Sequence, residues 1–215
     1  MPTDCIPFRD TNYFSALICD YLDEHKALKP FYNNFPKLEN FKAQIEEKGE
    51  SFQTQTRQVL VESLHKQYRN IDASALTLDN IETLKLDNTF TITTGHQLNL
   101  FTGPLYFLYK IISTINLTKE LKAKHPENNF VPVYWMATED HDFDEINYFN
   151  FKEKKVQWTR SASGGVGELD TQGLDQVFES YSNQLGQGKN ADFLRDLFKS
   201  AYLEHENLAE ATRYL

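Results

Sequence analysis

The segment Phe130–Ala137 constrains the fold of this chain more than any other. It is a nearly continuous apolar run, Phe-Val-Pro-Val-Tyr-Trp-Met-Ala. Such a run predicts a strand that is buried on both faces, as in a parallel sheet covered by helices. Pro132 belongs near the beginning of this strand, because proline cannot donate a hydrogen bond to a β-ladder.

A strand and a helix are predicted just before this run. Phe90–Thr94 is short, alternating and β-branched, which indicates a strand. Apolar residues at helical spacing then predict a helix that begins near Thr102, with Pro104 in its first turn, and ends near Lys124. Strand, helix and strand in this order form a βαβ unit with parallel strands and a right-handed crossover. We therefore expect an α/β fold.

The segments on either side of this unit are expected to be mainly helical. In the N-terminal segment, apolar residues from Tyr13 onward recur at helical spacing, with Asp10 or Thr11 as the expected cap. A long polar helix is predicted from Leu38 to about Tyr68, where few apolar positions form one thin stripe. The remaining predictions are a short helix near Leu78–Leu86, an edge strand or hairpin at Phe149–Trp158, a flexible loop at Ser161–Gly167, and helices at Gly173–Leu185 and Ala191–Leu215.

Composition excludes several classes of function. The net charge is −9 and the chain has no basic cluster, so we expect no nucleic-acid partner. The two cysteines form no CxxC motif, which argues against a zinc ribbon or a redox dithiol. No segment approaches the roughly 18 consecutive apolar residues that a membrane helix needs. Because Met1–Asp10 does not resemble a signal peptide, the expected compartment is the cytoplasm.

A first polar cluster follows the first predicted strand. Gly95 and Gly103 flank a loop that leads into a helix, whose free N–H groups and dipole favour an anion such as phosphate or carboxylate. The spacing matches neither the Walker pattern nor GxGxxG. The glycines could merely serve a turn, but a turn does not need so many polar neighbours. The residues of this cluster are Thr94, Gly95, His96, Gln97, Asn99, Thr102, Gly103 and Tyr106.

A second polar cluster, Glu139-Asp140-His141-Asp142, follows the apolar strand. Four ionisable groups at the end of a buried strand are costly unless they are solvated, paired or bound to a metal. A calcium loop is excluded, because Glu145 stands where that loop requires glycine. A divalent-metal site made by His96, His141 and Asp142 stays open. If the two strands are neighbours, both clusters lie at the carboxyl edge of the sheet, where α/β proteins bind ligands.

Both clusters lie within longer signatures that resemble those of a known family. The first signature is Thr93-Thr-Gly-His-Gln-Leu-Asn-Leu-Phe-Thr-Gly-Pro-Leu-Tyr106, with Lys110 shortly after it. The second is Val131-Pro-Val-Tyr-Trp-Met-Ala-Thr-Glu-Asp-His-Asp-Phe-Asp-Glu-Ile-Asn147. In this order, the two signatures resemble those of the bacillithiol biosynthesis cysteine-adding enzymes, also called cysteine ligases.

The resemblance implies a Rossmann-like core related to class I aminoacyl-tRNA synthetases. Residues 87–150 would be the first βαβ part of that core. Residues 1–86 would be a helical region packed on it, and residues 151–215 the start of an inserted connecting-peptide region. The implied reaction joins cysteine to glucosaminyl malate in the last step of bacillithiol synthesis. An amide bond is formed from a carboxylate, which is a poor acyl donor, so ATP is the expected cofactor and magnesium a candidate ion.

The resemblance also implies roles for the polar residues. The residues expected to be catalytic are His96, Asp140, His141 and Asp142. The residues expected to bind substrate or nucleotide are Thr94, Gly95, Gln97, Asn99, Thr102, Gly103, Tyr106 and Glu139.

The sequence departs from the family in two ways. Many members carry Gly-Gln-Gln where this chain has Gly95-His96-Gln97. Members are also more than twice as long and include a coiled-coil region, through which the full-length form would be a homodimer. Two other functions remain open: a metal-dependent hydrolase or transferase that uses His96, His141 and Asp142, and a non-catalytic module that binds a small molecule.

Overall fold

The computed structural model describes residues 4–215, which divide into two compact units, residues 4–88 and 89–215. The first three residues, which belong to the predicted N-terminal helical region, lie outside the described residues. The second unit contains a parallel sheet and helices, so the predicted α/β fold is confirmed. Within residues 4–215, no helix is both long and apolar enough to cross a membrane.

The first unit is helical in the part that the structure describes. Its α-helices are α1 (Ala16–Leu22), α2 (Phe41–Ser51), α3 (Thr54–Tyr68) and α4 (Ala75–Thr83), and short 3₁₀ turns cover Phe8–Thr11, Lys26–Phe31 and Leu38–Asn40. The predicted caps of the first helix are wrong. Ser15 caps α1, since its hydroxyl accepts a hydrogen bond from the Ile18 N–H at 3.4 Å. The Thr11 hydroxyl instead donates to the Phe8 carbonyl within the 3₁₀ turn.

The predicted long helix between Leu38 and Tyr68 is also wrong, because the chain breaks at Phe52. This residue has an extended backbone, and its ring packs against the Arg57 guanidinium with 5.0 Å between charge and ring centroid. Arg57 is only 3% exposed and donates to the backbone carbonyls of Leu84 (3.3 Å) and Asp87 (3.1 Å). Arg57 therefore ties α3 to the end of this unit.

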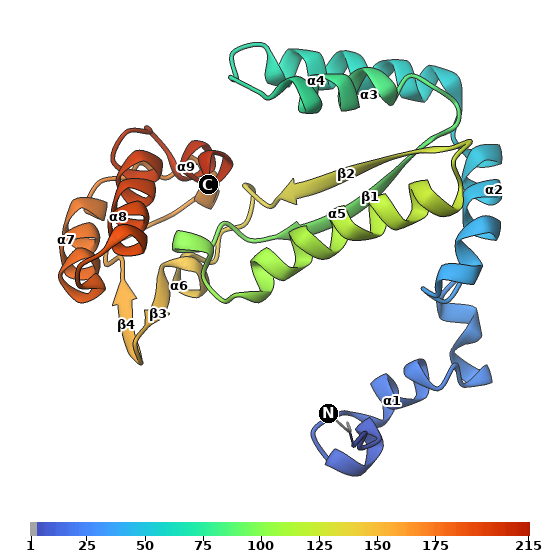
Figure 1. The fold of residues 1–215 in the computed structure, drawn as a ribbon, viewed down its shortest axis with the longest axis horizontal. Coiled ribbons are helices and arrows are strands. Elements are labelled where there is room, and N and C mark those ends of the chain that lie inside the picture. Colours follow the sequence, from blue (N-terminus) through green and yellow to red (C-terminus); the bar gives the residue numbers. More distant parts are fainter. Residues whose placement is uncertain (1–3) are drawn as a thin grey trace. The chain divides into compact units, whose positions relative to one another are not determined.

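The second unit begins with the predicted βαβ motif, drawn in green and yellow in Figure 1. Its elements are β1 (Thr89–His96), α5 (Tyr106–Lys124) and β2 (Asn129–Met136). The strands pair in parallel, in a register that runs from Thr89 opposite Asn129 to His96 opposite Met136. One expectation is corrected: β1 extends through Gly95 and His96, which the sequence places in a loop, because Gly95 and His96 continue the ladder with Trp135 and Met136.

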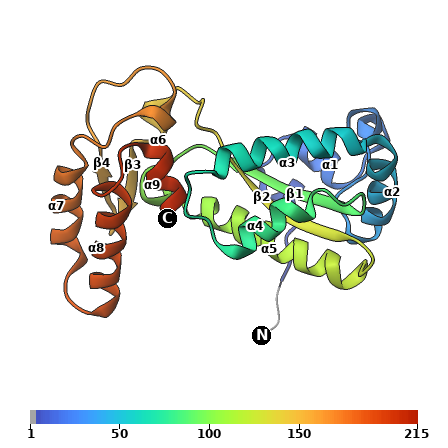
Figure 2. The same cartoon turned by 90° about the horizontal axis from the view of Figure 1, so that it is seen from above.

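The rest of the second unit is a hairpin with helices. The elements are α6 (Phe143–Ile146), β3 (Tyr148–Phe151), β4 (Lys154–Gln157), α7 (Leu174–Leu185), α8 (Lys189–Tyr202) and α9 (Leu208–Tyr214), with 3₁₀ turns at Leu100–Thr102 and Val166–Glu168. Figure 2 shows α7 and α8 side by side. The predicted single helix Ala191–Leu215 is wrong, because Asn207 begins a new helix by accepting a hydrogen bond from the Glu210 N–H at 2.9 Å.

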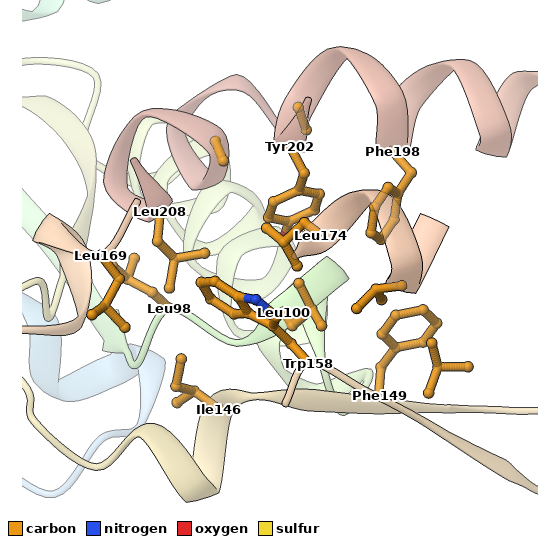
Figure 3. Packing of buried hydrophobic residues seen from close by; sticks show 14 of the residues in the cluster. Leu98, Leu100, Ile146, Phe149, Trp158, Leu169, Leu174, Phe198, Tyr202 and Leu208 are labelled. Atoms are coloured by element: carbon orange, nitrogen blue, oxygen red, sulfur yellow. The ribbon is translucent and has the colours of Figure 1, made fainter. Parts of the chain in front are cut away.

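One large hydrophobic cluster fills the space between the hairpin and these helices (Figure 3). Its largest fully buried members include Trp158, Tyr181, Tyr202 and Phe198. Leu98 and Leu100, from the segment that follows β1, are also fully buried in it. The first polar cluster is therefore anchored on both sides, by the parallel sheet and by this helical core.

Candidate functional site

The carboxyl ends of β1 and β2 lie side by side. His96 is opposite Met136, and the Ala137 N–H donates to the His96 carbonyl at 3.2 Å. Both polar clusters therefore leave the sheet at the same edge, as expected from the predicted strand pairing. In α/β folds this edge is where ligands bind.

His96 stands at the end of β1 with its ring between two aromatic side chains. The centroid of the His96 ring lies 4.9 Å from the centroid of the Tyr106 ring and 5.4 Å from that of the Phe107 ring. Nδ1 is 3.0 Å from the Gln97 carbonyl and 3.3 Å from the Asn99 amide nitrogen. One ring nitrogen cannot donate to a carbonyl and accept from an amide at the same time. In the tautomer that carries its proton on Nδ1, the ring donates to the Gln97 carbonyl and Nε2 is a hydrogen-bond acceptor.

Asn99 is the most buried polar residue of the first cluster, with 5% of its surface exposed. Within the described part of the chain, its Oδ1 atom has no hydrogen-bond partner. A buried acceptor without a partner costs free energy, and a bound ligand that donates a hydrogen bond would remove this cost. Gly103 packs against this side chain, since a Cβ at Gly103 would lie 2.6 Å from the Asn99 Cβ.

The loop before α5 has an unusual backbone. Phe101, Thr102 and Gly103 all have positive φ angles, of 45°, 65° and 46°. No described side chain caps the first turn of α5, and Tyr106 at its start is 54% exposed. The Phe107 N–H donates to the Pro104 carbonyl at 3.0 Å, and the other N–H groups at the start of this helix of 19 residues can bind an anion.

Lys110 also belongs to this site, although it is not among the predicted site residues. Its Nζ donates to the carbonyl of Gly95 at the end of β1. An open groove of about 420 Å³ runs between β1 and α5 and is lined by Ile92, Thr93, Thr94, Tyr106, Tyr109, Lys110, Ser113, Thr114 and Leu117. The sequence contains a signal for Lys110, because its spacing of four residues from Tyr106 places both on one face of the helix.

Asp140 and Gln97 connect the two clusters. The Asp142 N–H donates to Asp140 Oδ1 at 3.0 Å and is the main reason why the pKa of Asp140 lies below its usual 3.8. A hydrogen bond from the Gln97 side chain adds to this lowering of the pKa. Gln97 also donates to Glu145 at 2.8 Å. The first cluster therefore supplies a hydrogen-bond donor that stabilises a carboxylate of the second.

The other residues of the second cluster face solvent. Glu139, His141 and Asp142 are exposed to water. Solvation therefore removes the expected cost of placing these three ionisable groups at the end of a buried strand. In the described range 4–215, no three His, Cys, Asp or Glu side chains are close enough together to hold a metal ion. The predicted trio of His96, His141 and Asp142 is therefore not assembled, because His96 turns toward Gln97 and Asn99.

The glycine-rich loop lies directly against the second cluster. The Val166 N–H donates to the Asp140 carbonyl at 2.7 Å, and the Gly167 N–H donates to the Thr138 carbonyl at 3.0 Å. A Cβ at Gly167 would lie 2.6 Å from the Thr138 Cβ, so only glycine allows this approach. The prediction of a flexible connector is therefore wrong for the end of this loop, which holds the backbone of Thr138–Asp140.

Comparison with known proteins places this chain in a family. The family described as "Bacillithiol biosynthesis BshC, N-terminal Rossmann-like domain" matches residues 1–215. The chain belongs to this family. Membership confirms the resemblance carried by the two signatures and agrees with the parallel strands β1 and β2.

Several curated relatives of the family share the name "Putative cysteine ligase BshC". The relative from Flavobacterium johnsoniae is 62% identical over 215 residues, which cover 100% of this chain and 41% of the relative. The relative from Cytophaga hutchinsonii is 41% identical over 97% of this chain and 38% of its own length. The relative from Bacillus cereus is 32% identical over 77% of this chain and 32% of its own length. The chain thus spans about two fifths of the length of the first of these relatives.

Proposed function

We propose that this chain, within a polypeptide of the relatives' length, serves a ligase of bacillithiol biosynthesis. The ligase joins the carboxylate of cysteine to the amine of glucosaminyl malate, with ATP as the activating cofactor. The observation that supports this proposal is the position of the two polar clusters at the adjacent ends of β1 and β2, in a chain whose relatives are named cysteine ligases.

The first cluster fits a nucleotide and an amine. The uncapped start of α5 suits the phosphate groups of ATP, because its N–H groups and dipole attract negative charge. The buried Asn99 Oδ1 accepts hydrogen bonds, so it suits an ammonium, amine or hydroxyl group of a substrate. ATP supplies the leaving group that a carboxylate lacks.

The remaining roles follow from charge and protonation. The sugar amine loses a proton when it forms the amide bond. His96 Nε2 can accept that proton when the ring carries its own proton on Nδ1. Asp140 is held as a carboxylate by the Asp142 N–H and by Gln97, so it attracts the amino group of cysteine. Glu139 and Asp142, which are exposed carboxylates, are candidates for contacting a magnesium ion that accompanies the nucleotide.

The test is cysteine-dependent consumption of glucosaminyl malate in the presence of ATP and magnesium. A chain of the relatives' length is expected to form the amide product, whereas residues 1–215 alone are expected to form none. In the longer chain, Asn99→Ala is expected to lower kcat/KM about tenfold to a hundredfold, because a hydrogen bond to a charged group contributes about 1.5–3 kcal/mol. The nucleotide product, ADP or AMP, identifies whether an acyl phosphate or an acyl adenylate is formed.

The matched control is Asn150→Ala, at an exposed position of β3. This variant is expected to have a kcat/KM within about twofold of that of the unsubstituted longer chain, because surface substitutions usually have small effects. Ligand binding without turnover by the longer chain would contradict the proposal and favour a non-catalytic binding module.

A further inference from the structure

The loop Phe101–Gly103 is held in a conformation that its sequence does not favour. Phe101 (φ 45°, ψ 50°) and Thr102 (φ 65°) lie in the left-handed region, followed by Gly103 (φ 46°). Left-handed backbone is costly for residues that carry a Cβ atom and especially for β-branched threonine. Such a backbone persists only where surrounding contacts enforce it.

The enforcing contacts come from the helical core, far away in the sequence. The Phe101 N–H donates to the Tyr202 Oη at 2.7 Å, across 101 residues of sequence. The Phe101 ring also packs among aromatic rings of β3, α7 and α8, with centroid distances of 5.5 Å to Phe149, 5.3 Å to Tyr181 and 5.1 Å to Phe198.

Tyr202 is suited to this contact. It has no exposed surface, and burial raises the pKa of its phenol far above the usual value, so the hydroxyl stays neutral. Figure 3 shows Tyr202 and Phe198 extending from the same helix into the core that contains Leu100. An acceptor fixed in this way orients the Phe101 backbone.

The loop in turn determines where Asn99 lies. Leu98 and Leu100 on either side of Asn99 are fully buried in the same core. Gly103 approaches Asn99 so closely that the added Cβ would lie 2.6 Å from the Asn99 Cβ. A shift of Phe101–Gly103 would therefore change the position of the Asn99 side chain relative to His96, whose Nδ1 is 3.3 Å from the Asn99 amide nitrogen.

We infer that Tyr202 is a positioning residue for the site, through which helix α8 holds the loop Phe101–Gly103 and thereby Asn99 at the end of β1. This inference rests on the proposed function only in taking Asn99 as a substrate-binding residue. It gives the helices of the second unit a part in assembling the site, in addition to filling the core.

The test compares Tyr202→Phe with Tyr181→Phe in the 215-residue chain, by amide hydrogen exchange and NMR without substrate. Both changes remove one hydroxyl from the same aromatic cluster, but it is the Tyr202 hydroxyl that accepts the hydrogen bond from the loop backbone. We expect Tyr202→Phe to speed exchange at the Phe101 amide about fivefold to tenfold, which corresponds to the loss of one hydrogen bond. The side-chain amide signals of Asn99 should shift with it, whereas Tyr181→Phe should leave the Phe101 exchange rate within about twofold and the Asn99 signals in place.

Equal exchange rates and unchanged Asn99 signals in the two variants would overturn the inference. If Tyr202→Phe does not fold, Phe101→Leu weakens the hold of the same core on the loop by removing the ring contacts of Phe101 with Phe149, Tyr181 and Phe198. Its control is Phe178→Leu, at another ring beside Phe198. Only Phe101→Leu is expected to speed exchange in the loop and shift the Asn99 signals. These measurements use no substrate, so failure to detect ligase activity would count against the proposed function and leave this result intact.

Discussion

Gln97 is an uncharged side chain that lowers the pKa of a neighbouring carboxyl group. It stands directly after β1, yet its amide donates to Glu145 and contributes to the low pKa of Asp140, both of which follow β2. A carboxyl group whose folded-state pKa is lowered stabilises the fold above its ordinary pKa, and this stabilisation is lost as the pH falls through the lowered value. Asp140 therefore contributes to stability at neutral pH and ceases to do so in acid.

Removal of this donor should be visible in the titration of Asp140. We expect Gln97→Ala to raise the pKa of Asp140 part of the way toward its ordinary value, because the Asp142 N–H, the larger cause of the lowering, remains. The side-chain carboxyl signal followed by NMR against pH measures this change. Gln157→Ala, at an amide that donates to Asn147, is the control and should not change the titration. An unaltered Asp140 titration in Gln97→Ala would show that Gln97 does not lower the pKa of Asp140.

At the scale of elements, the glycine-rich loop and the second polar cluster behave as one piece. Two backbone hydrogen bonds, from Val166 and Gly167, join the loop to Asp140 and Thr138. The close approach at Gly167 leaves no room for a side chain. The loop therefore fixes the path of the backbone on which the acidic residues stand, although its composition alone indicates flexibility.

Gly167→Ala should disturb this arrangement. The added methyl group would overlap the Thr138 side chain, and overpacking of this kind costs about 1–3 kcal/mol. Urea unfolding measures the loss of stability, and the amide signals of Thr138–Asp140 should shift. Ser163→Ala, at an exposed position of the same loop, should change stability by less than about 0.5 kcal/mol. If both variants unfold at the same urea concentration, the loop does not support this segment.

At the scale of the whole molecule, α5 carries a stripe of exposed apolar residues on a sheet of only two strands. The stripe consists of Leu105, which directly precedes α5, and of Leu108, Tyr109, Ile112 and Ile115 within it, and all five are between 36% and 65% exposed. Their spacing of three or four residues places them on one face of the helix. Parallel sheets are usually covered on both faces, and contiguous apolar surface of this kind marks a contact surface or promotes aggregation.

We therefore expect the 215-residue chain to bind the dye ANS and to self-associate. Ile112→Lys should lower dye fluorescence because it places a charge in the middle of the stripe. Leu76→Lys, at an exposed apolar residue of α4 outside the stripe, should have less effect. A chain of the relatives' length should bind less dye per molecule, since additional polypeptide can cover the stripe. Equal dye binding by the two chain lengths would contradict this expectation.

Local patterns in the sequence determined the strands, the helix between them and the two polar clusters at their carboxyl ends. These features could be predicted because apolar periodicity and strand composition act over a few neighbouring residues. Only the tertiary structure decided where the helices break at Phe52 and before Asn207, and which distant residues support the site. Tyr202 reaches Phe101 and Gly167 reaches Thr138 across long stretches of chain, and no local pattern records such contacts. The physical reason is that buried packing and hydrogen bonding between distant segments outweigh local preference, which at Phe101 and Thr102 disfavours the backbone that the fold requires.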